Sequence, residues 1–593
     1  MPRCGIPGES GLVVILTVMF WARIQPLFVP AIPGPTASLR RYWYLPVFTA
    51  LIVAAAYLYL VVTIDNTNLG TTNGLWKSPA VFSWGHGLYV PLDSGGFLYG
   101  PIYGFFTRLI PDSLVHYGTP AADLTFRKMA VLNAIFGGLA SGLVCFLSLQ
   151  FTASPVSAGI VSLMHAGAGF VLLNSINSED IVPAYAFFLG ATVCFFEYLF
   201  RGGLWLCAAS AFLLTMATLL HWTVMPPGLA AFGAVYAVLL TRRLSFFWAG
   251  IAWLSLYLVF DQVVILLAFP SAHIPVWVVL HPAKADAAGW VGFFGEKGWN
   301  LLVGMGNYFA DGANLGDYKY AFGNALIFHL MVISWTALAL AMIASIVTLV
   351  RTPIASGLPL LAAFGIALFL TGEAGALHSQ PQDPQMQIEP MFAVISGMVL
   401  LLGWSSRLAG RLLRQGLAGA LALAGAANGA FNIHLMKAGS GQDSKAVAAV
   451  AEMDRLFPKD STLLVWHGFE GWTTWQWVLL WKDDSIGFFK QNVHLARPFT
   501  MNRGITGRQA AAITTAQIDA ALASGERVVA VALWPRPADE FVGSFTTVTT
   551  EVEARTYISL LKEHYRTGKR WDTQMGPFVE LLPADGRTGA AQP

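Results

Sequence analysis

The chain is poor in charged residues and in cysteine. Asp, Glu, Lys and Arg make up 11% of its 593 residues, whereas soluble domains carry roughly a quarter. This scarcity and the 55% hydrophobic content exclude an ordinary soluble protein and predict an integral membrane protein. The net charge of +2 gives no reason to expect a nucleic-acid partner. The four cysteines lie at the N-terminus or in apolar runs, which excludes a disulfide framework and a zinc site: Cys4, Cys145, Cys194 and Cys207.

Long apolar runs recur along most of the chain. About eleven of them approach the ~20 residues that a membrane-spanning helix needs, and they predict a polytopic α-helical membrane domain over residues 43–434. The runs lie near residues 43–63, 128–151, 156–173, 181–200, 204–220, 224–241, 246–269, 322–350, 357–372, 389–404 and 416–433. The N-terminal segment, residues 1–42, holds a shorter apolar stretch. It is a signal-like stretch, an interfacial helix or an artefact of the chosen start site.

Arginine gathers in the turns on one side of the predicted bundle. When the runs cross the membrane alternately, one side receives Arg40, Arg41, Arg201, Arg242, Arg243, Arg351, Arg407, Arg411 and Arg414. The positive-inside rule makes this side cytoplasmic. The other side receives most acidic residues and the long loops 64–127, 270–321 and 373–388. Long loops rich in Gly, Pro and aromatic residues suit a functional site. We therefore expect a protein of the cytoplasmic membrane with its site on the extracytoplasmic face.

Residues 435–593 have the composition of a soluble domain, which an odd number of crossings would export. Helical patterns alternate there with short apolar runs that read as strands, and this alternation predicts a small α/β domain. The helices are expected at 443–457, 516–525 and 552–566, and the strands at 461–466, 525–534 and 578–583. The tryptophan-rich segment Trp466–Trp481 is an aromatic sugar platform, an interfacial surface, or core packing with membrane contact.

The first outer loop contains PLDSGGFLYGPIYGF, Pro91–Phe105. This segment is too broken for a membrane helix and too aromatic for a plain solvent loop. We expect short helices along the membrane surface that form the lid or floor of a site, with Asp93, Tyr99 and Tyr103 as substrate-binding candidates. An Asp before Ser-Gly-Gly is also a common turn former, which is the alternative for Asp93.

Asp65 stands where the first long apolar run reaches the outer surface. The arrangement resembles the GT-C superfamily, polytopic membrane glycosyltransferases that take sugars from polyprenyl-phosphate donors at the outer face. Asp65 matches the superfamily's acidic residue after the first membrane helix, and YGPIYGF, Tyr99–Phe105, is similar to its Pro-aromatic segment. Asn66 stands where a second acidic residue often follows, and Pro101 replaces the usual paired prolines.

The resemblance implies a transferase that moves a hexosyl or pentosyl group onto a glycan, lipid or protein acceptor. A sugar hydroxyl is a weak nucleophile, so a carboxylate must accept its proton; Asp65 is the first candidate. Glu179 and Asp180 would assist this base or bind a divalent cation, as a second acidic motif does in some members. The alternatives are a helix-capping role for Asp65 and the general preference of acidic residues for a helix start at the other two.

The departing lipid phosphate gathers negative charge, which cations must neutralise. Candidates for this role are Arg108, His221, Lys319 and His378. Asp383, in the same polar loop as His378, is a further substrate-binding candidate. A lone histidine at a membrane surface is otherwise an ordinary interfacial residue.

Asp261 lies well inside an apolar run, where an ionisable group is costly. It lines a lipid groove or bonds to a neighbouring hydroxyl or histidine. Two other functions remain open: a transporter or lipid flippase, and a membrane anchor for an exported glycan-binding module.

Overall fold

The structure is a computed structural model in which the described residues form two compact units. The described residues are 41–64, 81, 98–111, 125–268, 296–309, 322–323, 325–378, 384–408, 411–438, 452, 455–457, 461–466, 493–495, 505–531, 549–573 and 576–584. The first unit comprises Met1–Thr63, Pro91–Tyr103 and Met129–Ala438. The second comprises Ile64–Val90, Gly104–Lys128 and Gly439–Pro593.

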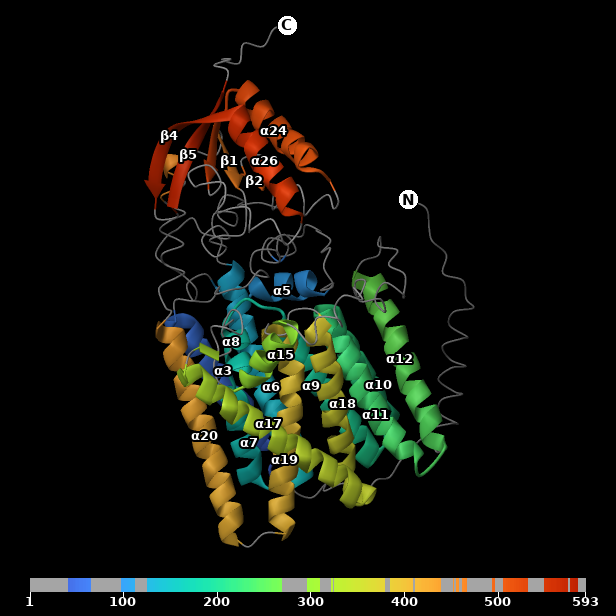
Figure 1. Ribbon diagram of the computed structural model, residues 1–593. Helices are drawn as coiled ribbons and strands as arrows, with labels where there is room; N and C mark the ends of the chain where they lie inside the picture. The colour runs from blue at the N-terminus through green and yellow to red at the C-terminus, as the bar shows by residue number, and fades with distance from the viewer. Residues whose placement is uncertain are drawn as a thin grey trace, which may run out of the picture. The chain divides into compact units, whose positions relative to one another are not determined.

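Each predicted apolar run coincides with helical structure, which confirms a polytopic α-helical membrane protein (Figure 1). The helices are α3 (Tyr44–Thr63), α5 (Tyr99–Thr107), α6 (Thr125–Thr152), α7 (Pro155–Gly167), α8 (Gly169–Ile176), α9 (Ile181–Arg201), α10 (Leu204–Leu220), α11 (Met225–Leu240), α12 (Ser245–Ala268), α15 (Glu296–Gly306), α17 (Ala325–Arg351), α18 (Leu358–His378), α19 (Pro384–Leu408) and α20 (Arg411–Ala438). Short 3-10 turns lie at Trp222–Val224 and Ile354–Ser356.

Not every one of these helices is long enough to cross a membrane on its own. Among the described residues, 7 helices have the length and apolarity of a span, or 8 if the bent pair α7 and α8 is one span. Leu204–Leu220, Met225–Leu240 and Gln387–Gly403 are shorter apolar helices. All three belong to the first unit and pack against longer helices. The count of about eleven crossings therefore stays a prediction.

The apolar run expected at 156–173 is broken in two. Helices α7 and α8 meet at an angle of 62°. The Gly167 carbonyl at the break accepts hydrogen bonds from Asn428 Nδ2 at 2.9 Å and Asn432 Nδ2 at 2.8 Å. The Tyr57 hydroxyl donates to the Ala166 carbonyl at 2.7 Å. These side chains pair two backbone carbonyls at the helix break, which in a membrane would otherwise have no partner.

Aromatic rings from four helices pack together in the interior of the first unit. Phe188 on α9 stacks on Phe364 of α18 with centroids 6.1 Å apart. Phe195, also on α9, contacts Phe232 of α11 edge-on at 4.6 Å, and Phe232 lies 4.9 Å from Trp253 of α12. Such pairs contribute about 0.5–1.5 kcal/mol each beyond the burial of their surface. This cluster holds α9, and the turn before it, in a fixed place.

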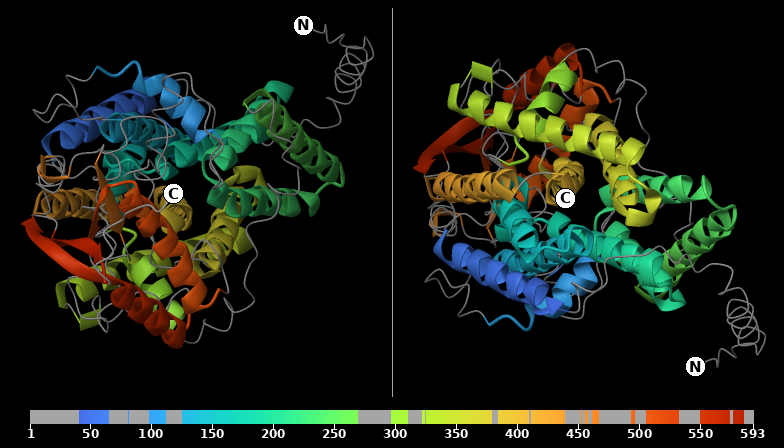
Figure 2. Two further views of the ribbon diagram at one scale, coloured as in Figure 1. Left: turned by 90° about the horizontal axis from the view of Figure 1, so that it is seen from above. Right: turned by 90° about the horizontal axis from the view of Figure 1, so that it is seen from below.

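The outward faces of several long helices carry large apolar side chains. In Figure 2, α3 and α12 lie at the margins of the helical bundle, and only 22% and 28% of their apolar windows are buried within the protein. Outward-facing apolar residues of this kind suit contact with lipid tails. They include Leu51, Tyr59, Leu267, Ile343 and Leu423.

The second unit contains the predicted α/β domain. Its sheet has the order β2-β1-β3-β5-β4, in which β1, β2 and β3 are parallel and β5 is antiparallel to both β3 and β4. The strands are β1 (Thr462–Trp466), β2 (Val493–Leu495), β3 (Arg527–Val531), β4 (Tyr565–Thr573) and β5 (Gly576–Pro583), and among the described residues of the domain the helices are α24 (Gly507–Ala523) and α26 (Glu551–His564). The strands expected at 461–466, 525–534 and 578–583 correspond to β1, β3 and β5.

The boundaries of α24 and α26 differ from the expectation. The helix expected at 516–525 begins already at Gly507, where the Thr506 side chain caps it by accepting a hydrogen bond from the Gln509 N–H, and it ends at Ala523. The helix predicted to continue to residue 566 ends at His564, because Tyr565 has extended backbone and begins β4. Tyr565 is held there by hydrogen bonds from its hydroxyl to the Asp519 carboxylate and the Thr515 carbonyl of α24. Most of the helix expected at 443–457, and the tryptophan-rich segment after Trp466, lie outside the described residues.

Candidate active site

Two acidic residues lie in the short turn between α8 and α9, which we call the acidic turn (residues 177–180). Glu179 and Asp180 are both buried. Asp180 occupies the position before the first residue of α9, yet its side chain makes no capping hydrogen bond to that helix. Helix capping, the ordinary reason for an acidic residue here, therefore does not account for the Asp180 carboxylate.

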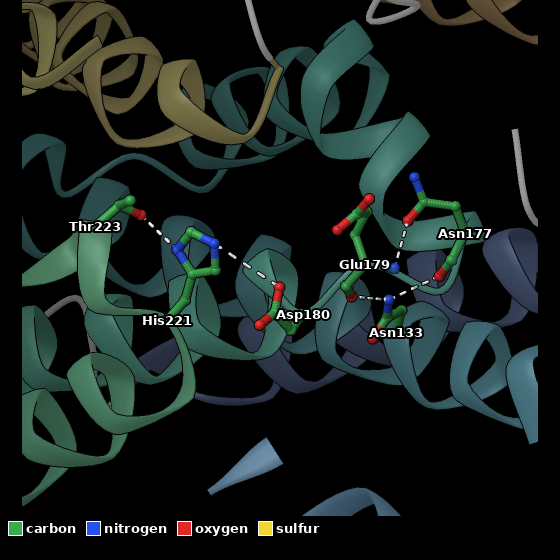
Figure 3. A network of polar contacts seen from close by, with 6 residues as sticks. All are labelled: Asn133, Asn177, Glu179, Asp180, His221 and Thr223. Atoms are coloured by element: carbon green, nitrogen blue, oxygen red, sulfur yellow. Dashed lines mark hydrogen bonds and ion pairs between the residues drawn. The ribbon is translucent and has the colours of Figure 1, made fainter. Parts of the chain in front are cut away.

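The Asp180 carboxylate faces a histidine that follows a different helix. His221 ends α10, and its Nε2 lies 3.8 Å from Asp180 Oδ1. The other ring nitrogen, Nδ1, contacts the Thr223 hydroxyl in the next turn of chain. Figure 3 shows the imidazole held between these two groups. Both His221 and Asp180 are buried, so their interaction is screened little by solvent.

The side-chain amide of Asn133, on α6, holds the backbone of the acidic turn in place. Asn133 Nδ2 donates to the Asn177 carbonyl at 2.7 Å and also to the Glu179 carbonyl. The Asn177 side chain in turn accepts a hydrogen bond from the Glu179 backbone N–H at 3.0 Å. Figure 3 shows the Glu179 and Asp180 side chains leaving the turn in different directions, with Asn133 beneath the backbone. The conformation of the turn is thus fixed by hydrogen bonds rather than by a cap.

Helix α5 contributes a tyrosine to the same network. The Tyr103 side chain is fully buried, and its hydroxyl donates to Asn133 Oδ1. Burial, reinforced by the negative charges of Asp180 and Glu179, raises the pKa of Tyr103 well above its ordinary value. The phenol therefore stays protonated and remains a hydrogen-bond donor.

Further carboxylates are buried near the same ends of the helices. Glu373 of α18 accepts hydrogen bonds from the Tyr308 hydroxyl and, at 3.2 Å, from Gln387 Nε2. Glu389, near the start of α19, is also buried, and its Oε1 has no hydrogen-bond partner among the described residues.

Asp261 lies on the side of α12 that faces α10. The Tyr257 hydroxyl, one turn earlier on α12, donates to Thr218 Oγ1 of α10 at 3.3 Å. Asp261 Oδ2 accepts from Gln262 Nε2 at 3.1 Å, whereas Oδ1 has no partner among the described residues. The described residues give it no histidine or hydroxyl partner.

The remaining predicted site residues are distributed as follows. Asp65, Asp93, Lys319 and Asp383 lie outside the described residues. Tyr99 and His378 are placed in helices α5 and α18, but their side chains are outside the described set. Arg108 is exposed and belongs to the second unit. Of the predicted residues, those brought together are Tyr103, Glu179, Asp180 and His221.

Asn133 is a central residue of this network that is not among the predicted site residues. The available signal was a polar amide inside the apolar stretch KMAVLNAIFGG, where a buried polar side chain needs a partner. Thr223, which contacts His221, gave no comparable signal.

The described residues contain no cluster of three or more His, Cys, Asp or Glu side chains arranged to hold a metal ion. The pair of Asp180 and His221 offers a carboxylate and an imidazole, which are groups used both for proton transfer and for metal binding. The arrangement can accept a proton at the carboxylate and, when the imidazole is doubly protonated, present a cation beside it.

Comparisons with known proteins give a likeness of fold only. No family model matches the sequence, and no curated protein matches it. Among solved structures, the chain is similar to ArnT from Cupriavidus metallidurans in the apo state, with 11% identity and a TM-score of 0.41 over 90% of this chain and 97% of that one. ArnT bound to undecaprenyl phosphate gives 11% identity and a TM-score of 0.38 over 92% and 99%. Likeness at this level assigns neither an activity nor a correspondence between individual residues.

Proposed function

We propose that the chain is a membrane glycosyltransferase that moves a sugar from a polyprenyl-phosphate donor to an acceptor at the outer face of the membrane. The observation that carries the proposal is the contact of Asp180 with His221, two buried titratable groups brought together at one end of a helical membrane bundle. The resemblance of Asp65 and the Tyr99–Phe105 segment to the GT-C pattern points to the same chemistry.

The reaction forms one bond and breaks one at the anomeric carbon of the sugar. The acceptor oxygen bonds to this carbon and loses its proton to a carboxylate, for which Asp65 is the proposed base, assisted by Asp180 and Glu179. The bond from the anomeric carbon to the phosphate oxygen breaks, and polyprenyl phosphate leaves with the electron pair. His221, when protonated, is placed to neutralise charge on that phosphate. A divalent cation would supply the same neutralisation.

We infer the orientation of the bundle from its arginines. Arg201, Arg242 and Arg351 lie at helix ends opposite to the acidic turn along α9, α11 and α17. Because positive turns stay on the cytoplasmic side, we assign the acidic turn to the extracytoplasmic side of the cytoplasmic membrane. The domain after Ala438 is assigned to that side as well.

The helix break between α7 and α8 is the feature that would favour a transporter, because transporters bind ions at the ends of broken helices. In this chain the carbonyl of Gly167 at the break is already paired with Asn428 and Asn432. The break therefore offers packing contacts rather than a binding site.

The test compares lipid-linked sugars and surface glycans by mass spectrometry. Cells with the native protein, a deletion, Asp65→Ala and Asp180→Asn would be examined at equal protein levels. We expect the deletion and both variants to lose the same glycan sugar and to accumulate the same lipid-linked donor. Identical glycans and donor levels in native and deletion cells would refute the proposal.

A further inference from the structure

The start of helix α5 is hydrogen-bonded to the residues that hold Asp180 and His221 in place. At its start, the Leu98 backbone N–H donates to the Leu219 carbonyl at 3.1 Å, two residues before His221. One turn further, the Tyr103 hydroxyl donates to Asn133, the residue that holds the acidic turn. The segment Leu98–Tyr103 therefore connects the end of α10 with the start of α9. In Figure 1, α5 runs across the ends of the long helices.

Asn133 joins these contacts through a single planar amide. Its oxygen accepts from Tyr103, and its nitrogen donates to the Asn177 and Glu179 carbonyls. The backbone carbonyls can only accept hydrogen bonds, so they take the two N–H donors of the amide, and its oxygen is left facing Tyr103. The Tyr103 hydroxyl then satisfies this oxygen by donating to it. Tyr103 thereby holds the oxygen end of the amide that shapes the acidic turn.

From this geometry we infer that Tyr103 and Asn133 are positioning residues that set the separation of Asp180 and His221. The inference rests on the proposed function, because it concerns the same reaction. Neither residue needs to touch the substrate. A small displacement of reacting groups can lower a rate by about a hundredfold, so weakening this support should reduce turnover more than binding.

The test uses purified full-length protein and, as probe, the lipid-linked sugar extracted from deletion cells. Tyr103→Phe removes one hydroxyl and keeps the ring. Asn133→Asp keeps the acceptor oxygen and removes the two N–H donors. We expect each variant to lower kcat by about 10- to 100-fold with KM changed less than about threefold. Because the two residues share one hydrogen bond, the double variant should lose less than the product of the single losses.

Ser141→Ala is the matched control on the same helix. Its hydroxyl is buried in α6 and contacts the Gly137 carbonyl and His165, away from the acidic turn. We expect it to leave kcat within about threefold. Thermal unfolding of every variant separates positioning from general loss of stability.

The outcomes separate this inference from the proposed function. If the native enzyme is active and Tyr103→Phe has the same kcat, the positioning role is overturned and the proposed function is not. A kcat loss of equal size in Ser141→Ala would also overturn it, because it would reflect general packing. A native protein that transfers no sugar from the extracted donor would overturn both.

Discussion

His221 Nε2 lies 3.8 Å from Asp180 Oδ1, although the two residues belong to different helix ends. Leu219, just before the histidine, and Asn133, beneath the acidic turn, are both bonded to the segment Leu98–Tyr103. The contact is therefore supported from three elements of the first unit.

Asp180 and His221 should act as one unit in the reaction. Groups that take part in proton transfer or charge neutralisation typically contribute 10²–10⁴-fold in rate, so Asp180→Asn and His221→Gln should each lower kcat by about that factor. The kcat of the double variant should be little lower than that of the less active single variant, since the effects of residues that act together are non-additive. Steady-state kinetics of the four proteins provides the measurement. Losses that simply multiply would show that the two residues act independently.

Asp261→Leu should stabilise the protein. Asp261 Oδ1 is buried without a hydrogen-bond partner among the described residues, and an unpaired buried polar group costs roughly 1–3 kcal/mol. A leucine removes that cost, so the unfolding temperature in detergent should rise. Glu197→Leu is the control, and it should lower the unfolding temperature, because the Glu197 carboxylate is paired with Gln150 at 2.8 Å and with Arg201 at 2.7 Å. A lower unfolding temperature for Asp261→Leu would mean that the carboxylate has a stabilising role.

Asn432→Leu should destabilise the break between α7 and α8 more than Asn428→Leu. Asn432 Nδ2 donates to the carbonyls of Gly167 and Phe309, both at 2.8 Å, whereas Asn428 Nδ2 donates only to Gly167. Asn432→Leu therefore removes two hydrogen bonds and Asn428→Leu removes one, and a typical hydrogen bond contributes about 0.5–1.5 kcal/mol. After either change the Gly167 carbonyl keeps the other asparagine as a donor, and the Phe309 carbonyl keeps the Gly169 N–H at 3.0 Å. Thermal unfolding ranks the two variants, and the reverse order would contradict this account of the break.

Gly507→Ala should destabilise the second unit. A Cβ at Gly507, the first residue of α24, would lie 2.2 Å from the Glu553 carbonyl oxygen of α26. Backbone on both sides leaves little room to yield, and overpacking costs typically about 1–3 kcal/mol. Gly416→Ala on α20, where a Cβ meets nothing within 4 Å, is the control. Limited proteolysis of the C-terminal domain is the measurement, and Gly507→Ala should be cleaved faster than Gly416→Ala. Equal rates of cleavage would show that α24 and α26 separate easily.

The sequence predicted the helical bundle because apolar runs of membrane length are strong signals. It did not show the break after Gly167, because both halves of that run are apolar and the amides that pair its carbonyl come from α20. In the second unit, periodicity identified α26 but not its end. Tyr565 leaves the helix to bond with Asp519 of α24, a contact between residues distant in sequence.

Only part of the candidate site is visible in the local sequence. Glu179, Asp180 and His221 were recognised as titratable residues at helix ends. Their contact depends on how α9 and α10 pack, which the local sequence does not specify. Asn133 and the connecting role of Tyr103 depend on hydrogen bonds across three elements.

The most direct test of the account is the lipid-linked sugar content of cells in which Asp180→Asn replaces the native protein at equal abundance. We predict that one polyprenyl-phosphate sugar accumulates to the level found in deletion cells, while the same sugar disappears from the surface glycans. A native lipid-linked sugar profile together with native glycans in the Asp180→Asn cells would contradict it.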